Sequence, residues 1–309
     1  MLHGRALDLI MAVNRQLPDP FNIAFFILEQ YRQKFGRYPN VLNPVTFNEK
    51  IQARKLFDRR PILATIADKL AVRDYVAGRV GPEILPELYH VTTNPRELPF
   101  AGLPDRYVVK ATHGSGWVVL VQDNKTHDQA GLVATCEKWL EHNYHDLTCE
   151  WSYKDIPRRI MVEEFLDNGD GQPASDLKLF TFNGRVEYIQ VDVARFIDHG
   201  KNFFDRGWNR IELRQEADNF PGLIEKPVNL AALIDCAEAL AKGLDFVRVD
   251  LYNARNRIYF GELTATPGNG LFRFEPEQYD ERFGGLWRME ISSLAGLLSG
   301  HESANEEAT

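Results

Sequence analysis

Two acidic side chains inside otherwise apolar segments are the first residues of this 309-residue chain that suggest chemistry. Asp250 and Glu262 lie in segments that are joined by a short turn at residues 253–256. A turn of three or five residues would place both carboxylates on one face of a β-hairpin, as diagonal neighbours roughly 7 to 8 Å apart. Two acids that close repel unless a cation lies between them, and oxygen ligands beside phosphate favour Mg²⁺. The alternative is a solvated hairpin face on which Arg248 and Arg257 neutralise the acids.

A lysine beside a glycine loop suggests a phosphate site. Lys110 ends a β-branched segment, and the loop His113-Gly114-Ser115-Gly116 follows almost at once. Exposed N–H groups of such a loop can line an anion, and an ammonium next to them suits a phosphate. His113 would either contact the phosphate or cap the loop. The alternative is a hairpin turn beside an exposed lysine.

Other nucleotide signals are weaker. Residues 161–166 end a predicted strand ahead of a polar loop, which is typical of an adenine slot but also of many other strand ends. The chain has no G-x-x-x-x-G-K-[ST] pattern, and neither Gly114-Ser115-Gly116 nor Gly268-Asn269-Gly270 has the third glycine of a dinucleotide-binding fingerprint. Residues 167–171 lack the ligand spacing of a calcium loop, so we predict a turn there.

The elements that must position these residues read as an α+β fold. Asn183-Gly184 between two alternating segments supplies the positive φ angles of a type I′ turn, so we predict an antiparallel hairpin around it. A second hairpin is predicted over 247–263. Between them we predict a helix over 230–242, with Asn229 as its N-cap and a glycine just past its end.

The first third of the chain has a helical pattern. The pattern is helical from 46 to 80 and ends at Gly81-Pro82, whereas strands are predicted at 107–110, 117–121 and 160–163. Residues 1–30 are predicted to form an amphipathic helical arm. Its apolar face would pack on this chain or on a second copy, and peripheral membrane contact through residues 1–28 is the alternative.

Composition narrows the class of protein. Lys and Arg number 36 against 44 Asp and Glu, so the net charge of −8 argues against a large basic surface for nucleic acid. The 3 cysteines form no C-x-x-C pair, which predicts neither a zinc site nor a disulfide framework. We find no export signal or membrane-spanning run. We therefore expect a cytoplasmic protein, with the inner face of the membrane as an alternative location.

The order of the chemical residues resembles the ATP-grasp superfamily. The residues that carry this resemblance are Lys110, the loop 113–116, the segment 163–166, Lys178, Asp250, Glu262 and Thr264. More narrowly, four segments look like the TupA-like ATP-grasp family, which is associated with teichuronopeptide and surface-polysaccharide synthesis: 43–50, 67–73, 246–252 and 260–264. The resemblance covers about residues 31 to 290.

The resemblance implies two α+β subdomains whose antiparallel sheets sandwich ATP. A small helical N-terminal region precedes them in the chain. The implied divisions are a helical arm 1–30, a helical region 31–100, a small lid subdomain 101–165, a large subdomain 166–296 and a disordered acidic tail 297–309.

It also implies roles for individual residues. The ATP-binding residues would be Lys110, His113, Gly114, Ser115, Gly116, Glu163, Glu164, Phe165, Leu166 and Lys178. The Mg²⁺ ligands would be Asp250, Glu262 and Thr264. Many ATP-grasp ligases have asparagine in place of Thr264, so the number of Mg²⁺ ions stays open. Arg195 and Arg248, with Lys178 as a further catalytic candidate, would orient a substrate carboxylate; the alternative is that the arginines pair with Asp192 and Asp250.

The implied function is an ATP- and Mg²⁺-dependent ligase that joins a carboxylate to an amine through an acyl phosphate. Its partners would be small acids and amines, glycan-linked or free, and not nucleic acid. A homo-oligomer is left open. Three rival functions remain: a phosphotransferase with the same ATP site, a glycosyltransferase, although the chain has no Asp-x-Asp motif, and a non-catalytic scaffold.

Overall fold

The protein is described here from a computed structural model, for residues 21–168, 174–193 and 200–289. The α-helices are α2 (Phe21–Phe35), α3 (Phe47–Phe57), α4 (Pro61–Ala67), α5 (Ala71–Val80), α6 (Gln129–Glu141), α7 (Tyr144–Thr148), α8 (Leu230–Ala241) and α9 (Gln278–Leu286). The 3-10 turns are η1 (Pro82–Ile84), η2 (Pro95–Glu97), η3 (Phe100–Gly102), η4 (Trp151–Tyr153) and η5 (Pro267–Gly270).

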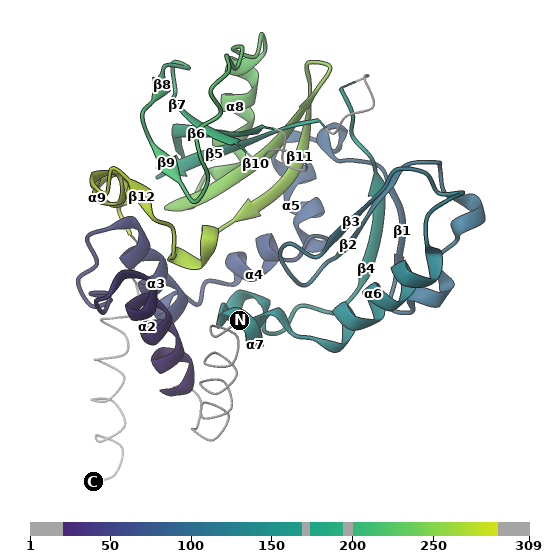
Figure 1. Ribbon diagram of the computed structural model, residues 1–309, viewed down its shortest axis with the longest axis horizontal. Coiled ribbons are helices and arrows are strands. Elements are labelled where there is room, and N and C mark those ends of the chain that lie inside the picture. Colours follow the sequence, from purple (N-terminus) through teal and green to yellow (C-terminus); the bar gives the residue numbers. More distant parts are fainter. Residues whose placement is uncertain (1–20, 169–173, 194–199, 290–309) are drawn as a thin grey trace.

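The strands form two larger antiparallel sheets and one small one, in keeping with the predicted α+β class. The four-stranded sheet has the order β1-β4-β2-β3, the six-stranded sheet β11-β10-β5-β6-β7-β8, and β12 pairs with β9. The strands are β1 (Leu88–Thr92), β2 (Tyr107–Ala111), β3 (Val118–Val121), β4 (Ile160–Glu164), β5 (Ser175–Phe182), β6 (Arg185–Val193), β7 (Gly200–Asp205), β8 (Arg210–Ile211), β9 (Arg214–Gln215), β10 (Phe246–Ala254), β11 (Arg257–Thr264) and β12 (Phe274–Glu275). The two larger sheets lie apart from each other, and α4 and α5 run between them (Figure 1).

Both predicted hairpins are confirmed. Asn183 and Gly184, with φ angles of 50° and 79°, turn β5 into β6, as the type I′ prediction requires. Arg255 and Asn256, with φ angles of 52° and 62°, turn β10 into β11 in the same way. The second turn therefore has two residues, and not the three or five expected.

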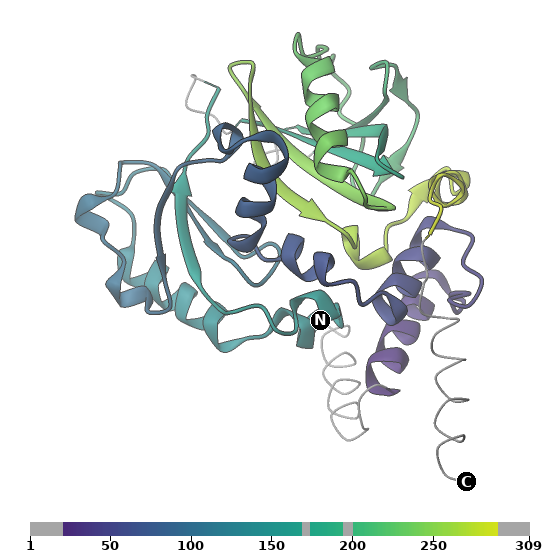
Figure 2. The same cartoon turned by 180° about the vertical axis from the view of Figure 1, so that it is seen from behind.

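Helices cover the faces of the sheets that carry the apolar side chains. Helix α8 lies across one face of the six-stranded sheet, with α5 beside it (Figure 2). Its Leu233, Ala237 and Leu240 are fully buried in one core with Leu179 and Val249 of the sheet. Helix α6 covers the four-stranded sheet, and its Leu132 and Cys136 are buried in one core with that sheet.

The helical pattern predicted over 46–80 is confirmed as α3, α4 and α5, since Pro61 starts α4 and the Asp68 carboxylate accepts a hydrogen bond from Leu70 N at 2.8 Å just before α5. Two other expectations about the helical segments need correction. Strand β1 lies inside 31–100, where only helices were expected, and it pairs with β4. Asn229 stands at the N-cap of α8 without capping it, since its Oδ1 accepts from Asn253 Nδ2 at 3.0 Å instead.

A buried ion pair joins α3 to the start of β10. Arg54 donates from Nη2 to Asp245 Oδ1 at 2.6 Å, and both side chains are almost completely buried. The Trp287 ring lies 4.3 Å from the Arg54 guanidinium carbon and its Nε1 donates to Asp245 Oδ2 at 2.8 Å. Because the charges are paired and hydrogen-bonded, their burial is tolerated.

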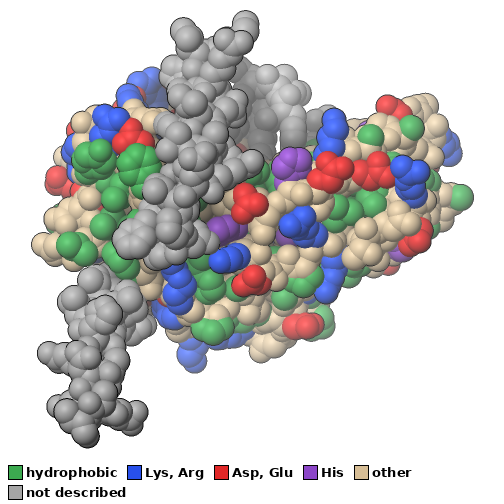
Figure 3. Space-filling view, turned by 90° about the horizontal axis from the view of Figure 1, so that it is seen from below, with side chains coloured by type: hydrophobic (Ala, Val, Ile, Leu, Met, Phe, Trp, Pro, Cys, Tyr) green, Lys and Arg blue, Asp and Glu red, His purple; other side chains and the backbone are tan. Residues whose placement is uncertain are grey.

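The surface carries charges of both signs, and the two terminal regions lie mostly outside the described residues. The face seen in Figure 3 mixes acidic and basic side chains over the part formed by described residues. Within the described ranges no helix is long and apolar enough to cross a membrane. Most of the predicted arm 1–30 and the whole predicted tail 297–309 lie outside the described residues; α2 begins at Phe21.

Phe47 is the residue whose truncation should most weaken this packing. Its fully buried ring has six aromatic neighbours at centroid distances of 5.0 to 6.4 Å, contributed by β5, β10, β12, α9 and Trp287. Phe47→Ala should lower the free energy of unfolding by about 3 to 5 kcal/mol in urea denaturation, because it leaves a cavity at the centre of the cluster. Phe25→Ala, at a ring that is 49% exposed, is the matched control and should cost far less. Equal losses in the two variants would contradict this assignment.

Candidate functional site

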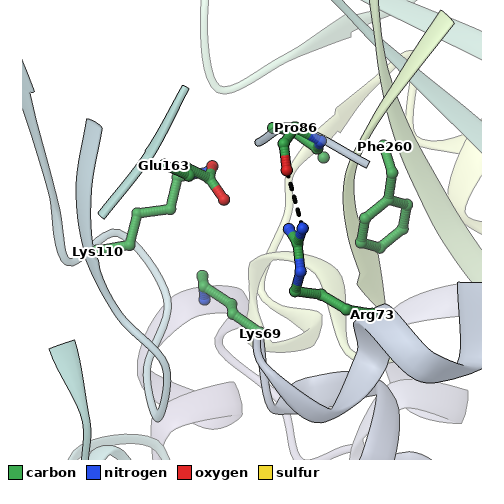
Figure 4. A pocket seen from close by; sticks show the side chains of 7 residues that line it. Lys69, Arg73, Pro86, Lys110, Glu163 and Phe260 are labelled. Carbon is green, nitrogen blue, oxygen red and sulfur yellow. Dashed lines mark hydrogen bonds and ion pairs between the residues drawn. The ribbon is translucent and has the colours of Figure 1, made fainter. Parts of the chain in front are cut away.

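The candidate site is a pocket between the two larger sheets. Lys110 and Glu163 of the four-stranded sheet line one side, and Phe260 of β11 lines the other. Lys69 and Arg73 close it from the junction of α4 and α5, as Figure 4 shows. Lys110 pairs with Glu163, and Lys69 and Arg73 add two further positive charges, which favours an anionic ligand.

Lys69 is hydrogen-bonded to the glycine loop that was predicted to bind phosphate. Its Nζ donates to the carbonyl of Gly114, and its backbone N donates to Thr112 O at 3.1 Å. Burial lowers the pKa of the Lys69 ammonium. The neighbouring Arg73 donates from Nη2 to Pro86 O at 2.9 Å (Figure 4).

His113 anchors the loop from behind. Its Nε2 donates to Trp139 O at 2.9 Å and its ring lies 5.3 Å from that of Trp117. Burial lowers the pKa of His113, so the ring is neutral near pH 7. The geometry favours the loop-anchoring role over a phosphate contact. A glycine is needed at 114, since a Cβ there would lie 2.6 Å from Trp117 Cε3.

On the facing sheet, Asp250 and Glu262 lie directly opposite each other. They are register partners and not the diagonal neighbours expected. The reason is a bulge: a two-residue turn would pair Asp250 with Gly261, but the register shifts between Asp250 and Leu251 and brings in Glu262. Gly261 permits this approach, because a Cβ there would lie 2.9 Å from the Asp250 carbonyl oxygen.

Two buried cations neutralise these acids. Arg248 donates from Nε and Nη2 to the two oxygens of Asp250, both at 2.7 Å, and from Nη2 to Glu262 Oε1 at 3.0 Å. Lys178 is the register partner of Asp250 on β5 and its Nζ lies 3.2 Å from Asp250 Oδ2. Lys178 also pairs with Asp176 and lies 3.7 Å from Asp192 Oδ2.

The pKa values of the two acids shift in opposite directions. Burial raises the pKa of Asp250 to about 6, against the opposing effect of Arg248 and Lys178. Burial also disfavours the Glu262 carboxylate, but Arg248, Lys69, Lys178 and the Thr264 hydroxyl together lower its pKa to about 2. The environments are therefore unequal although the residues are paired, and such separation is frequent at functional sites.

The donor set fits Mg²⁺. Asp250, Glu262 and Thr264 offer hard oxygen ligands, and Thr264 Oγ1 already donates to Glu262 Oε1 at 2.9 Å. In the described part of the chain no three His, Cys, Asp or Glu side chains gather as a metal site. Mg²⁺ does not need such a cage, because it commonly takes one or two carboxylates plus phosphate oxygens. Arg248 Nη2 lies between the two acids, where a metal ion would compete with it.

The predicted adenine segment lies at the end of β4. Glu164 is hydrogen-bonded through its backbone N to Glu87 O at 2.9 Å. Phe165 is buried with the Arg106 guanidinium 4.9 Å from its ring, and the carbonyl of Leu166 accepts from Ala174 N at 3.0 Å.

The two arginines that were predicted to bind a substrate carboxylate are Arg195 and Arg248. Arg195 lies outside the described residues. The structure supports the alternative for Arg248, pairing with Asp250, in place of an orienting contact with substrate.

Sequence reasoning missed two cations of the pocket. Lys69 and Arg73 lie in segment 67–73, which carried the family resemblance without a role for either side chain. Their spacing of four residues at the start of a helix was the available signal. It was too common to single out, because helices frequently carry basic residues on a solvated face.

Comparison with known proteins gives one family match and several structural similarities. The TupA-like ATP-grasp family model matches residues 49–288. No curated protein matches the chain. Solved structures that resemble it include D-alanine–D-alanine ligase from Bacillus anthracis complexed with ATP, at 17% identity and a TM-score of 0.40 over 67% of this chain and 56% of that one.

Two further structures are similar at the same low level. D-alanine–D-alanine ligase from Coxiella burnetii has 12% identity and a TM-score of 0.45 over 84% of this chain and 69% of that one. The ATP-grasp ligase PsnB complexed with minimal precursor has 15% identity and a TM-score of 0.38 over 75% of this chain and 58% of that one. The family match spans more than half of the sequence, and the chain belongs to the TupA-like ATP-grasp family.

Proposed function

We propose that this protein is an ATP- and Mg²⁺-dependent ligase that joins a carboxylate to an amine through an acyl phosphate. The observation that carries the proposal is the pocket that Lys69, Arg73 and Lys110 line, next to the sheet on which Asp250 and Glu262 are register partners. Basic groups on one wall suit the phosphates of a nucleotide, and paired acids on the other suit the cation that accompanies them.

The reaction explains why such a site needs no nucleophilic side chain. A carboxylate oxygen of the acid attacks the γ-phosphorus of ATP, and ADP leaves with the electron pair of the broken P–O bond. The amine nitrogen then attacks the acyl carbon, phosphate leaves, and the nitrogen loses its extra proton. Mg²⁺ supplies charge neutralisation on the transferred phosphoryl group.

Within this proposal Lys110 and Lys178 bind phosphates, and the loop 113–116 closes over them with its N–H groups. Lys178 must then exchange part of its carboxylate contacts for phosphate oxygens. The adenine ring would lie against the end of β4, near Phe165. Asp250, Glu262 and Thr264 would hold Mg²⁺.

Arg248 has a positioning role in this proposal. Its guanidinium contacts Asp250, Glu262 and Thr264 at 2.7 to 3.3 Å, and the contacts of Nη2 are those with which the metal ion would compete. The contact of Nε with Asp250 Oδ1 at 2.7 Å would remain and orient that carboxylate when the metal nucleotide binds.

We propose the pathway from the family association alone. The family's association with teichuronopeptide and surface polysaccharide supports acid and amine substrates destined for a cell-surface polymer, made in the cytoplasm or at the inner face of the membrane. A phosphotransferase would use the same ATP site with a hydroxyl acceptor, and it would yield a phosphorylated product without an amide.

The nucleotide site is tested by thermal stability with ATP, GTP or a UDP-sugar, each with and without Mg²⁺. A ligand at about 100 times its dissociation constant should add roughly 2.7 kcal/mol to the free energy of unfolding. We expect the largest shift with ATP and Mg²⁺ together. A larger shift with the UDP-sugar, or none with ATP, would contradict the proposal.

Asp250→Asn tests the metal ligands. The variant should keep a shift with ATP alone but lose most of the further shift that Mg²⁺ produces, because a neutral amide is a weaker ligand for a hard cation. Asp218→Asn, at a side chain that is 90% exposed, is the matched control and should keep the Mg²⁺ effect. An unchanged Mg²⁺ effect in Asp250→Asn would remove Asp250 from the metal site.

Lys110→Met tests the phosphate contact. ATP affinity measured by calorimetry should fall at least about tenfold, since a charge-assisted hydrogen bond is lost, whereas adenosine affinity should stay nearly unchanged. Lys125→Met, at an 80% exposed side chain, is the control. If adenosine weakens as much as ATP, Lys110 supports the fold and not the phosphates.

A further inference from the structure

A carboxylate next to the predicted adenine segment is paired with arginines of two distant segments. Asp167 lies between β4 of the four-stranded sheet and β5 of the six-stranded sheet, directly after Leu166. Its side chain is 10% exposed, and it forms ion pairs with Arg106 and Arg255. The proposed contacts with ATP and Mg²⁺ use none of these three charged side chains.

Arg106 connects this carboxylate to the predicted adenine segment. It comes directly before β2, its Nη2 donates to Asp167 Oδ2, and its guanidinium carbon lies 4.9 Å from the centroid of the Phe165 ring. A guanidinium is attracted to the face of an aromatic ring, and the carboxylate fixes where that guanidinium lies. The buried Phe165 ring is therefore held in place from a residue two positions further along the chain.

Arg255 connects the same carboxylate to the other large sheet. It is the first residue of the two-residue turn between β10 and β11, and its Nη2 donates to Asp167 Oδ1 at 2.9 Å. Its φ angle of 52° is one that Asn, Asp and Gly adopt most readily in such a turn. The turn therefore gives no reason for an arginine at this position, whereas the contact with Asp167 does.

These two contacts join strands that line the pocket on its two sides. Glu163 of β4 lines one side and Phe260 of β11 lines the other. Asp167 follows the end of β4, and Arg255 precedes the start of β11 by two positions. Because the Arg255 side chain is 66% exposed, its ion pair adds little to the stability of the fold. Its main effect is on geometry, namely the distance between the end of β4 and the tip of the β10–β11 hairpin.

We propose that Asp167 is a positioning residue for the adenine base. Through Arg106 it holds Phe165, and through Arg255 it holds the tip of the β10–β11 hairpin, so the slot between β4 and β11 keeps its width before the nucleotide binds. A slot that is already ordered loses less conformational freedom when the base enters, which raises affinity. This inference rests on the proposed function and adds to it a residue that acts through its neighbours.

The first test separates the base from the phosphates. Calorimetry with the full chain measures the affinities for adenosine, for ATP with Mg²⁺ and for inorganic tripolyphosphate with Mg²⁺. Asp167→Asn should weaken adenosine and ATP by the same factor, at least about threefold, because an amide pairs less strongly with the two guanidinium groups than a carboxylate does. The affinity for tripolyphosphate should stay unchanged, which a general loss of structure would not allow.

Two further variants serve as rescue and control in this test. Asp167→Glu keeps the charge and should recover most of the adenosine affinity. Asp105→Asn, at a side chain that is 70% exposed and paired with Lys125, is the matched control and should bind all three ligands as the unaltered protein does.

The second test uses salt. Adenosine is uncharged, so a dependence of its affinity on ionic strength has to come from ion pairs of the protein. Salt screens the exposed contact of Arg255, and raising NaCl from about 0.05 to about 0.5 M should weaken adenosine about two- to fivefold in the unaltered protein. Arg255→Gln should weaken adenosine at low salt and abolish this dependence. Arg96→Gln, at a 76% exposed side chain paired with Glu137, is the control and should retain it.

The failures can be told apart. If ATP and Mg²⁺ stabilise the protein but Asp167→Asn and Arg255→Gln bind adenosine as the unaltered protein does, the positioning role is wrong and the proposed function stands. If Asp167→Asn weakens tripolyphosphate as much as adenosine, Asp167 supports the fold alone and the positioning role is again wrong. If ATP and Mg²⁺ produce no stabilisation of the unaltered protein, the proposed function fails and this inference fails with it.

Discussion

The register of β5, β10 and β11 holds a set of buried charged side chains next to one another. Asp250 of β10 lies between Lys178 of β5 and Glu262 of β11, and each is its direct cross-strand partner. Opposite charges on adjacent strands lie close enough to offset the cost of desolvation, provided that the register does not slip. A slip of one residue would turn the acids into the apolar core under α8 and bring Val249 to the cleft. The site and the fold of this sheet therefore depend on one pairing.

The rest of the molecule protects that pairing. Helix α8 buries the apolar face behind it, and the aromatic cluster around Phe47 closes the far end of the polar face. Helix α3 is fixed to the sheet through Arg54 and Asp245, and its Lys55 donates to Asn269 Oδ1 in η5. One helix thus supplies an ion pair to the sheet and, at the next residue, a hydrogen bond to η5. Adjacent side chains on a helix point about 100° apart, which makes the two tasks compatible.

Local signals explain what the sequence could predict. Asn183-Gly184 specifies its turn within four residues, and α8 carries its own apolar stripe, so both were predicted correctly. The Gly261 bulge was not, because it changes the register without altering the alternation of polar and apolar residues. Contacts between distant segments could not be predicted from the sequence either. Lys69 meets Gly114 across 45 positions and Thr266 meets Glu150 across 116, and no periodicity in one segment indicates its partner in another.

The four-stranded sheet is joined to the remainder at a point where the chain both arrives and departs. Strand β1 starts just after Glu87 and β4 ends at Glu164, and these two residues exchange hydrogen bonds, Glu164 N to Glu87 O at 2.9 Å and Glu87 N to Glu164 Oε2 at 3.2 Å. The link is not confined to this edge, because Thr266 donates to the Glu150 carboxylate and Lys69 donates to the Gly114 carbonyl. Any widening of the cleft would break both contacts and leave two buried charged groups, Lys69 and Glu150, each without a hydrogen-bond partner that it has now.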